Sequence, residues 1–209
     1  MDSAAAHGPG DRARRGSDPA VEEVALAGSK KNAAKEGRTI VFVDESGLTE
    51  KPHRVRTWAP KGETPVLQHH FHWNNLSAIA GITFWNFYFR LFPGSIKSPQ
   101  VILFLEHLLR HVGGRLLVVW DRLNAHRSYL LADYLAARHP LIQVEFLPAY
   151  APELNPVEFL WGHWKQHELP NLCPQSFAQL GYHARLALRR MRRRPTLVTA
   201  FWRQAELFD

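Results

Sequence analysis

Two short runs of sequence decide the expected fold: Thr39-Ile-Val-Phe-Val-Asp44 and Arg115-Leu-Leu-Val-Val-Trp-Asp121. Each is apolar between its first residue and its final acid. A continuous apolar run of this length is typical of a strand covered on both faces, as in the middle of a layered sheet. In open α/β sheets, ligands bind at the carboxyl ends of the strands. The two runs therefore predict an α/β fold with a polar site at one edge of its sheet.

The segments around these runs predict a central mixed sheet with helices on both faces. Further strands are expected at residues 54–59, 65–67, 76–83, 84–92 and 142–147, the first two around a Pro60-Lys-Gly62 turn. Apolar residues at helical spacing, with Ser and Asn caps, predict helices at residues 99–111, 129–138, 155–167 and 177–193. Strands followed by alternating helices and strands are typical of a layered α/β domain.

Length and composition limit the class of protein. A chain of 209 residues fits one domain. Residues 1–37 are rich in small and charged side chains, so we expect a disordered or linker-like tail before a folded domain at 38–209. The chain has no membrane-length apolar run and no signal pattern, which favours a cytoplasmic protein without a membrane partner. The single Cys173 excludes an internal disulfide and disfavours a cysteine-based zinc site.

The charge balance points to a polyanionic partner. The formal net charge is +7, and seven arginines without any acidic residue lie between Gly181 and Arg203. Arginine suits bidentate contacts with phosphate. The same residues can also form a solvated helix face, and charge alone does not separate the two interpretations. The candidate DNA contacts on this helix are Arg185, Arg189, Arg192 and Arg193.

Asp44 and Asp121 predict a metal site as a pair, because either one alone could be an ordinary turn residue. Two close carboxylates repel each other unless a cation lies between them, and all-oxygen ligands select Mg²⁺ or Mn²⁺ over zinc. A third acid, Glu158, occurs in Leu154-Asn-Pro-Val-Glu158-Phe-Leu-Trp161. It is the third helical residue after an Asn155 cap, where the Glu of a capping box would also lie. The residues alone leave both roles of Glu158 open.

Three motifs in this order resemble those of the mariner-type insertion-sequence transposases, which are DDE enzymes with an RNase H-like fold. They are Asp44-Glu-Ser-Gly47, Asp121 with Asn124 and His126 after it, and the segment around Glu158. The resemblance covers about residues 30 to 209 and makes the folded region a catalytic domain. It implies that Asp44, Asp121 and Glu158 are the catalytic, metal-binding triad. It also implies two Mg²⁺ or Mn²⁺ ions, hydrolytic nicking at element ends and strand transfer into target DNA.

The resemblance also implies partners for the chain. Arg122, Asn124 and His126 become candidate DNA contacts, with Arg122 standing where the family often has Asn. We expect a homodimer on DNA in the bacterial cytoplasm, associated with the nucleoid. A helix-turn-helix protein or a fused upstream domain is expected to read the terminal repeats, because the residues before the first strand are too few to form one. A stand-alone RNase H-like nuclease and an inactive DNA-binding transposase remnant are the alternatives.

Overall fold

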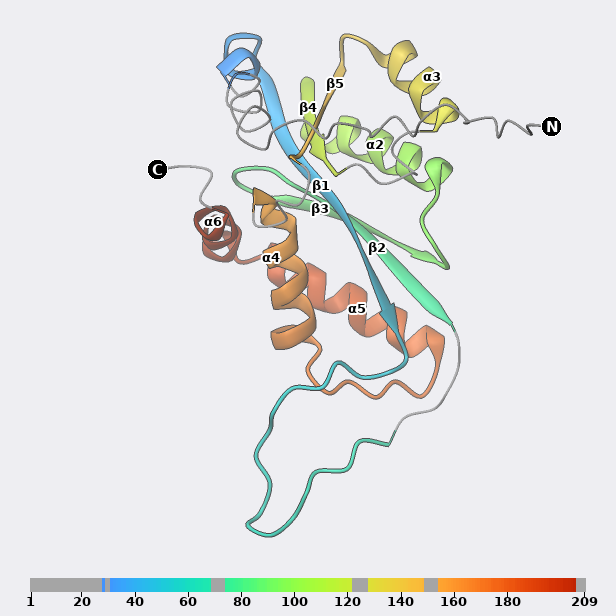
Figure 1. Cartoon of the computed structure of the whole chain (residues 1–209), viewed down its shortest axis with the longest axis vertical. Helices are drawn as coiled ribbons and strands as arrows, with labels where there is room; N and C mark the ends of the chain where they lie inside the picture. The colour runs from blue at the N-terminus through green and yellow to red at the C-terminus, as the bar shows by residue number, and fades with distance from the viewer. Residues whose placement is uncertain (1–27, 29–30, 69–73, 122–127, 149–153, 206–209) are drawn as a thin grey trace, which may run out of the picture.

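The structure, a computed structural model, describes residues 28, 31–68, 74–121, 128–148 and 154–205. Its centre is a five-stranded mixed sheet in the order β3-β2-β1-β4-β5 (Figure 1). β2 is antiparallel to both β1 and β3, whereas β4 is parallel to both β1 and β5. The strands are β1 Arg38–Thr49, β2 Asn75–Ile82, β3 Phe87–Pro93, β4 Arg115–Trp120 and β5 Ile142–Phe146. The predicted α/β architecture is confirmed.

Helices cover both faces of this sheet, with α2 and α3 on one side and α4, α5 and α6 on the other (Figure 1). The apolar residues form two clusters, one on each face, which explains why β1 and β4 are apolar without alternation. The helices are α2 Ser98–Val112, α3 Tyr129–Arg138, α4 Pro156–His163, α5 Phe177–Arg192 and α6 Pro195–Gln204, and a π-helical turn, η3 Trp164–Glu168, continues α4.

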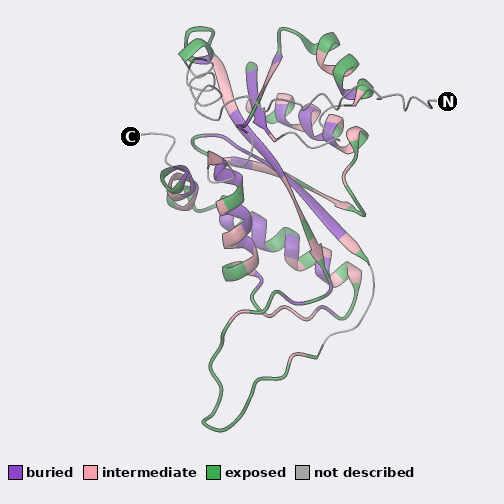
Figure 2. Cartoon of the chain, in the orientation of Figure 1, coloured by how far each residue is buried: buried purple, intermediate pink, exposed green. Residues whose placement is uncertain are grey.

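The central strand β1 is buried on both sides along its middle (Figure 2). Val41 and Val43 belong to the cluster under α2, while Phe42 belongs to the cluster under α4 to α6. Close packing on the α2 side requires the glycine at position 81. A Cβ added to Gly81 would lie 2.9 Å from the Val41 Cγ1 atom and 3.2 Å from a methyl of Leu108. β1 is thus held rigidly between two layers of helices.

Several helix and strand boundaries follow the predictions because local signals set them. β4 and α3 begin and end at the predicted residues, and Ser128 caps α3 by accepting a hydrogen bond from the Leu131 N–H. Asn155 caps α4 in the same way through the Val157 N–H. The helix predicted at residues 155–167 is α-helical only to His163, and it continues as the π-helical turn η3.

The predicted strands at 54–59 and 65–67 are wrong. This segment is a long loop that projects from the body of the molecule, although the expected turn is present, with Glu63 N–H donating to the Pro60 carbonyl (Figure 1). No strand pairs with it among the described residues, and its apolar side chains find no core: Trp58 is 98% exposed and Val66 80%. Alternating apolar and polar residues do not stabilise a hairpin when neither face of it is buried.

Two helical segments lie outside the sequence prediction. Helix α6 was not expected, yet its Val198, Phe201 and Trp202 are buried in the core. Residues 31–35, within the predicted tail, are helical, and Ala33 is only 2% exposed.

Candidate active site

The sheet brings Asp44 and Asp121 to its neighbouring strands β1 and β4. These strands pair in parallel, with Phe42 against Val119, and Asp121 directly follows Trp120, the last residue of β4. The two strands are adjacent as predicted, although Asp121 lies just beyond the end of its strand. Asp44 is not the end of its strand, however. β1 runs on to Thr49 because β2 pairs with it, setting Ala80 against Asp44, so this acid is held by strands on both sides.

The Asp44 carboxyl is buried, with only 6% of the residue exposed. Its Oδ2 atom accepts a hydrogen bond of 2.9 Å from the indole Nε1 of Trp161, which fixes its orientation. Burial, followed by the negative charges of Glu158 and Asp121, raises the pKa of Asp44 to about 7, although the Glu45 backbone N–H and Trp161 act in the opposite direction. Asp44 therefore takes up a proton far more readily than an exposed aspartate does.

Glu158 stands in the first turn of α4 and interacts electrostatically with Asp121. The Asn155 side chain supplies the cap of this helix, which leaves the Glu158 carboxyl free for the site. Partial burial, together with the charge of Asp121, raises the pKa of Glu158, while the Lys165 ammonium acts to lower it. The three acids thus share one electrostatic environment at the junction of β1, β4 and α4.

Two residues of this environment were missed by the sequence prediction. Trp161 was quoted within a motif and given no role, although its indole binds Asp44. Lys165 lies one turn beyond Trp161, in η3. Burial lowers the pKa of Lys165, while the negative charges of Glu158 and Asp44 act to raise it. Helical spacing could have suggested both, because residues three, four and seven positions after Glu158 return to nearly the same side of a helix.

The donor set of the three acids fits a hard divalent cation. All three offer carboxylate oxygens. Burial first, and then repulsion from the neighbouring acids, raises the pKa values of Asp44 and Glu158, and a bound cation would neutralise this negative charge. Within the described ranges, no three His, Cys, Asp or Glu side chains are gathered into a finished metal-binding cluster.

The arginines of α5 and of the two residues that follow it fall into two groups. Arg190 and Arg194 both pair with Glu168, whose side chain is 8% exposed, and this ion cluster ties η3 to α5 and to the residue before α6. The four predicted DNA contacts, Arg185, Arg189, Arg192 and Arg193, are exposed. Of these, Arg192 places its guanidinium 5.8 Å from the centre of the Phe89 ring. The other three candidates, Arg122, Asn124 and His126, lie outside the described residues.

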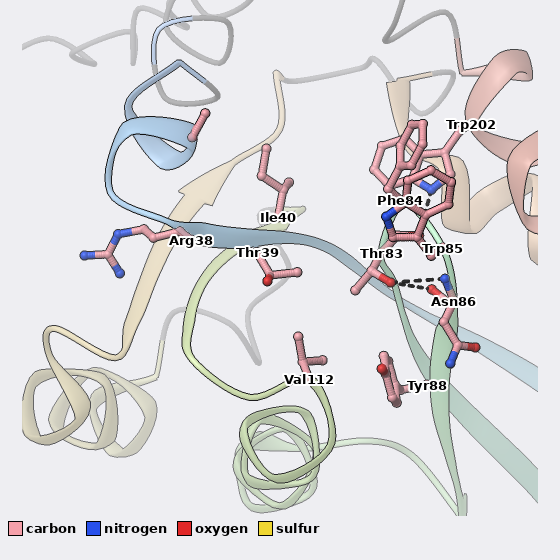
Figure 3. A pocket seen from close by; sticks show the side chains of 11 residues that line it. Arg38, Thr39, Ile40, Thr83, Phe84, Trp85, Asn86, Tyr88, Val112 and Trp202 are labelled. Carbon is pink, nitrogen blue, oxygen red and sulfur yellow. Dashed lines mark hydrogen bonds between the residues drawn. The ribbon is translucent and has the colours of Figure 1, made fainter.

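A cavity of about 460 Å³ lies away from the acids. It is lined by the start of β1 and by the turn between β2 and β3, where Trp202 donates to the Thr83 carbonyl (Figure 3). Figure 3 shows Trp202, Phe84 and Trp85 on one side of it and Val112 on the other. No acidic side chain lines this cavity, so it is not the candidate active site.

Comparison with known proteins agrees with this arrangement. The family described as DDE superfamily endonuclease matches residues 39–180, which contain all three acids, and the chain belongs to this family. No curated protein matches the sequence. Among the parts of the chain that the structure describes, no helix combines the length and apolar character needed to cross a membrane.

Solved structures of Mos1 transposase share the fold. The Mos1 paired-end complex with left transposon end matches with a TM-score of 0.64 and 16% identity, over 99% of this chain and 62% of that one. The Mos1 catalytic domain with Raltegravir and Mn matches with a TM-score of 0.58 and 16% identity, over 95% and 91%. The fold is therefore RNase H-like, as predicted, and the chain spans about three fifths of the transposase in the paired-end complex.

Proposed function

We propose that this chain is the catalytic domain of a metal-dependent DNA transposase, which nicks DNA at element ends and joins the freed strand to target DNA. The observation that carries the proposal is the meeting of Asp44, Asp121 and Glu158 from two parallel strands and one helix terminus. Membership of the DDE endonuclease family supports it. So does the likeness to Mos1 transposase, whose structures include a paired-end complex with a transposon end.

The three carboxylates would hold Mg²⁺ or Mn²⁺, two ions in the full site. Such ions activate a water or a 3′-hydroxyl for attack on phosphorus and stabilise the leaving oxygen. Asp44 must lose its proton to act as a ligand, and Trp161 keeps its carboxyl turned into the site meanwhile. The Lys165 ammonium, beside Glu158 and Asp44, adds a fixed positive charge near the phosphate to be cleaved.

The partners follow from the same proposal. The exposed arginines of α5 offer phosphate contacts, which position DNA without reading its sequence. Because such contacts carry no sequence information, we propose that a helix-turn-helix partner or fused domain reads the terminal repeats. The domain acts as a homodimer on DNA, so that two element ends are handled together in the bacterial cytoplasm.

A cleavage assay on three substrates tests this function. The purified chain is incubated with supercoiled DNA, linear duplex DNA and an RNA–DNA hybrid, each with Mg²⁺, with Mn²⁺ or with EDTA. We expect cation-dependent nicking of DNA and little cleavage of the hybrid. Preferential cleavage of the RNA strand would identify an RNase H-like nuclease instead. DNA binding without any cleavage would identify an inactive remnant.

A further inference from the structure

A band of basic side chains surrounds the free edge of the sheet, outside the candidate active site. β3 is the outermost strand on this side of the sheet, and helices α2 and α5 pack against it from opposite faces (Figure 1). We call the band the β3-edge patch. It consists of Arg90 on β3, His107, Arg110 and His111 on α2, and Arg192 on α5. All of these side chains except His107 are exposed.

The charges of this patch lie close enough to act on one another. Burial first, and then nearby positive charges, lowers the pKa of His107 to about 4. These charges belong to His111, Arg90, Arg110 and Arg192. Basic groups from one strand and two helices therefore converge at a single place on the surface. Such a concentration of one sign of charge repels itself and attracts an anionic partner.

The arginines of the patch are not neutralised by the protein. Within the described ranges, none of the three forms an ion pair with a carboxylate. The single acid of α2, Glu106, pairs with Arg138 of α3, although the charge of Arg110 also contributes to lowering the pKa of Glu106. The sequences of β3 and α5 contain no acid. The patch therefore presents its positive charge to the solvent.

Aromatic rings of β3 hold two of these guanidinium groups in place. The Arg90 guanidinium lies 5.6 Å from the centre of the Phe92 ring, and the Arg192 guanidinium lies over Phe89, on the opposite face of the sheet. One N–H of Arg90 also donates to the Leu103 carbonyl, at 3.5 Å. A contact through the flat face of a guanidinium leaves most of its N–H donors free. These donors match the oxygens of a phosphate group.

The strand register sets this patch beside the candidate active site. Asp44 of β1 lies opposite Ala80 of β2, which in turn lies opposite Phe89 of β3. Phe89 is therefore level with Asp44 and two strands away, which corresponds to about 10 Å. A DNA duplex carries one phosphate charge about every 1.7 Å along its axis. The backbone of one duplex can thus reach from the acids to the edge of the sheet.

We propose that the β3-edge patch binds the phosphate backbone of duplex DNA, as a second contact surface beside the carboxylate site. The inference rests on the proposed function, because it takes DNA as the partner. Arg90 and Arg110 form direct phosphate contacts, which hold the duplex without reading its sequence. The competing explanation is that Arg90 only prevents the free edge from pairing with a strand of another molecule.

Salt-dependent DNA binding by the double variant Arg90→Gln/Arg110→Gln tests the inference. A labelled blunt duplex is titrated by fluorescence anisotropy at several salt concentrations in EDTA, so that binding is measured without cleavage. Each lost phosphate contact flattens the log–log dependence of affinity on salt by about one unit. We expect the double variant to lose about two units of slope and to bind roughly ten-fold or more weakly at about 0.1 M salt. Arg90→Gln alone should lose about one unit.

Arg115→Gln/Arg203→Gln is the matched control, since it removes the same charge from exposed positions on β4 and α6. It should keep the wild-type slope, and all variants should melt like the wild type. An equal loss of slope in both double variants, or no loss in Arg90→Gln/Arg110→Gln, would overturn the inference. Self-association of Arg90→Gln with unchanged DNA affinity would also overturn it and would identify an edge-protecting role. Failure of the proposed function would show separately, as absence of cation-dependent cleavage by the wild type.

Discussion

At the scale of single residues, the balance of charge at Asp44 has a direct consequence for stability. Its pKa in the folded protein, about 7, lies above its ordinary value of 3.8, so the folded state binds more protons between these two values. The contribution of Asp44 to stability therefore falls as pH rises from about 4 to 7 and stays low above this range. The ionised carboxylate at pH 8 costs roughly 2–4 kcal/mol when no cation is present.

The first prediction is that Asp44→Asn stabilises the metal-free protein. The amide oxygen can still accept the Trp161 hydrogen bond, while the buried charge is removed. In EDTA at pH 8, we expect the free energy of unfolding to rise by roughly 2–4 kcal/mol, and by much less at pH 5, where Asp44 is already neutral. Urea unfolding at both pH values measures this. A gain that is equal at pH 5 and pH 8 would contradict the assigned cause.

The second prediction concerns Lys165. Replacing it with Gln removes the positive charge beside Glu158 and Asp44, so the pKa values of both acids should rise and the loss of activity at low pH should begin at a higher pH. We expect DNA cleavage at pH 7.5 to fall roughly ten-fold or more. Lys165→Arg should retain part of the activity. Lys97→Gln, at an exposed position before α2, is the control, and an equal loss in this variant would refute a role at the site.

At the scale of helices and strands, α5 combines two functions that its sequence does not separate. Neutralising Arg185, Arg189, Arg192 and Arg193 together should flatten the dependence of DNA affinity on salt by about one unit of log–log slope per lost phosphate contact. Neutralising Arg190 and Arg194 should mainly lower the melting temperature, because these two pair with the buried Glu168 carboxylate. Binding titrations at several salt concentrations check this. An unchanged slope in the four-residue variant would assign its arginines to a solvated face.

The elements that the sequence predicts well are those with strong local signals. β1 and β4 are apolar because both sheet faces are covered, and Ser128 and Asn155 mark the helix starts. The prediction of a hairpin at 54–67 is wrong. The turn residues are present, but no strand forms on either side of them, and this depends on tertiary packing that the local sequence does not show. α6 was missed, because its place depends on packing against α4.

The candidate site also combines features that local sequence predicts with features that depend on tertiary packing. The motifs point to Asp44, Asp121 and Glu158 as the candidate acids. The pairing of β1 with β4, and the hydrogen bond from Trp161 to Asp44, depend on how distant segments of the chain meet. Helical spacing indicates which side of α4 Trp161 shares with Glu158, but its contact with Asp44 depends on tertiary packing.

At the scale of the whole molecule, the central claim is that three segments far apart in the chain meet to form one catalytic site. Asp44 and Asp121 come from neighbouring parallel strands, and Glu158 comes from the helix that covers them. In the proposed site each carboxylate helps to hold the same cations, so loss of one should disable the site while the fold survives. Asp121 is suited to this test, because it follows the last residue of β4 and substitution there leaves the sheet pairing intact.

The most direct measurement is therefore the rate of Mn²⁺-dependent DNA nicking by the Asp121→Asn protein. Asp133→Asn is the matched control, since Asp133 is an exposed acid on α3. Both variants should melt like the wild type. We expect nicking by Asp121→Asn to fall by roughly a hundred-fold or more, the scale seen when one preorganised catalytic group is removed. Asp133→Asn should retain the wild-type rate. Nicking by a folded Asp121→Asn protein at a rate near that of the wild type would contradict the account.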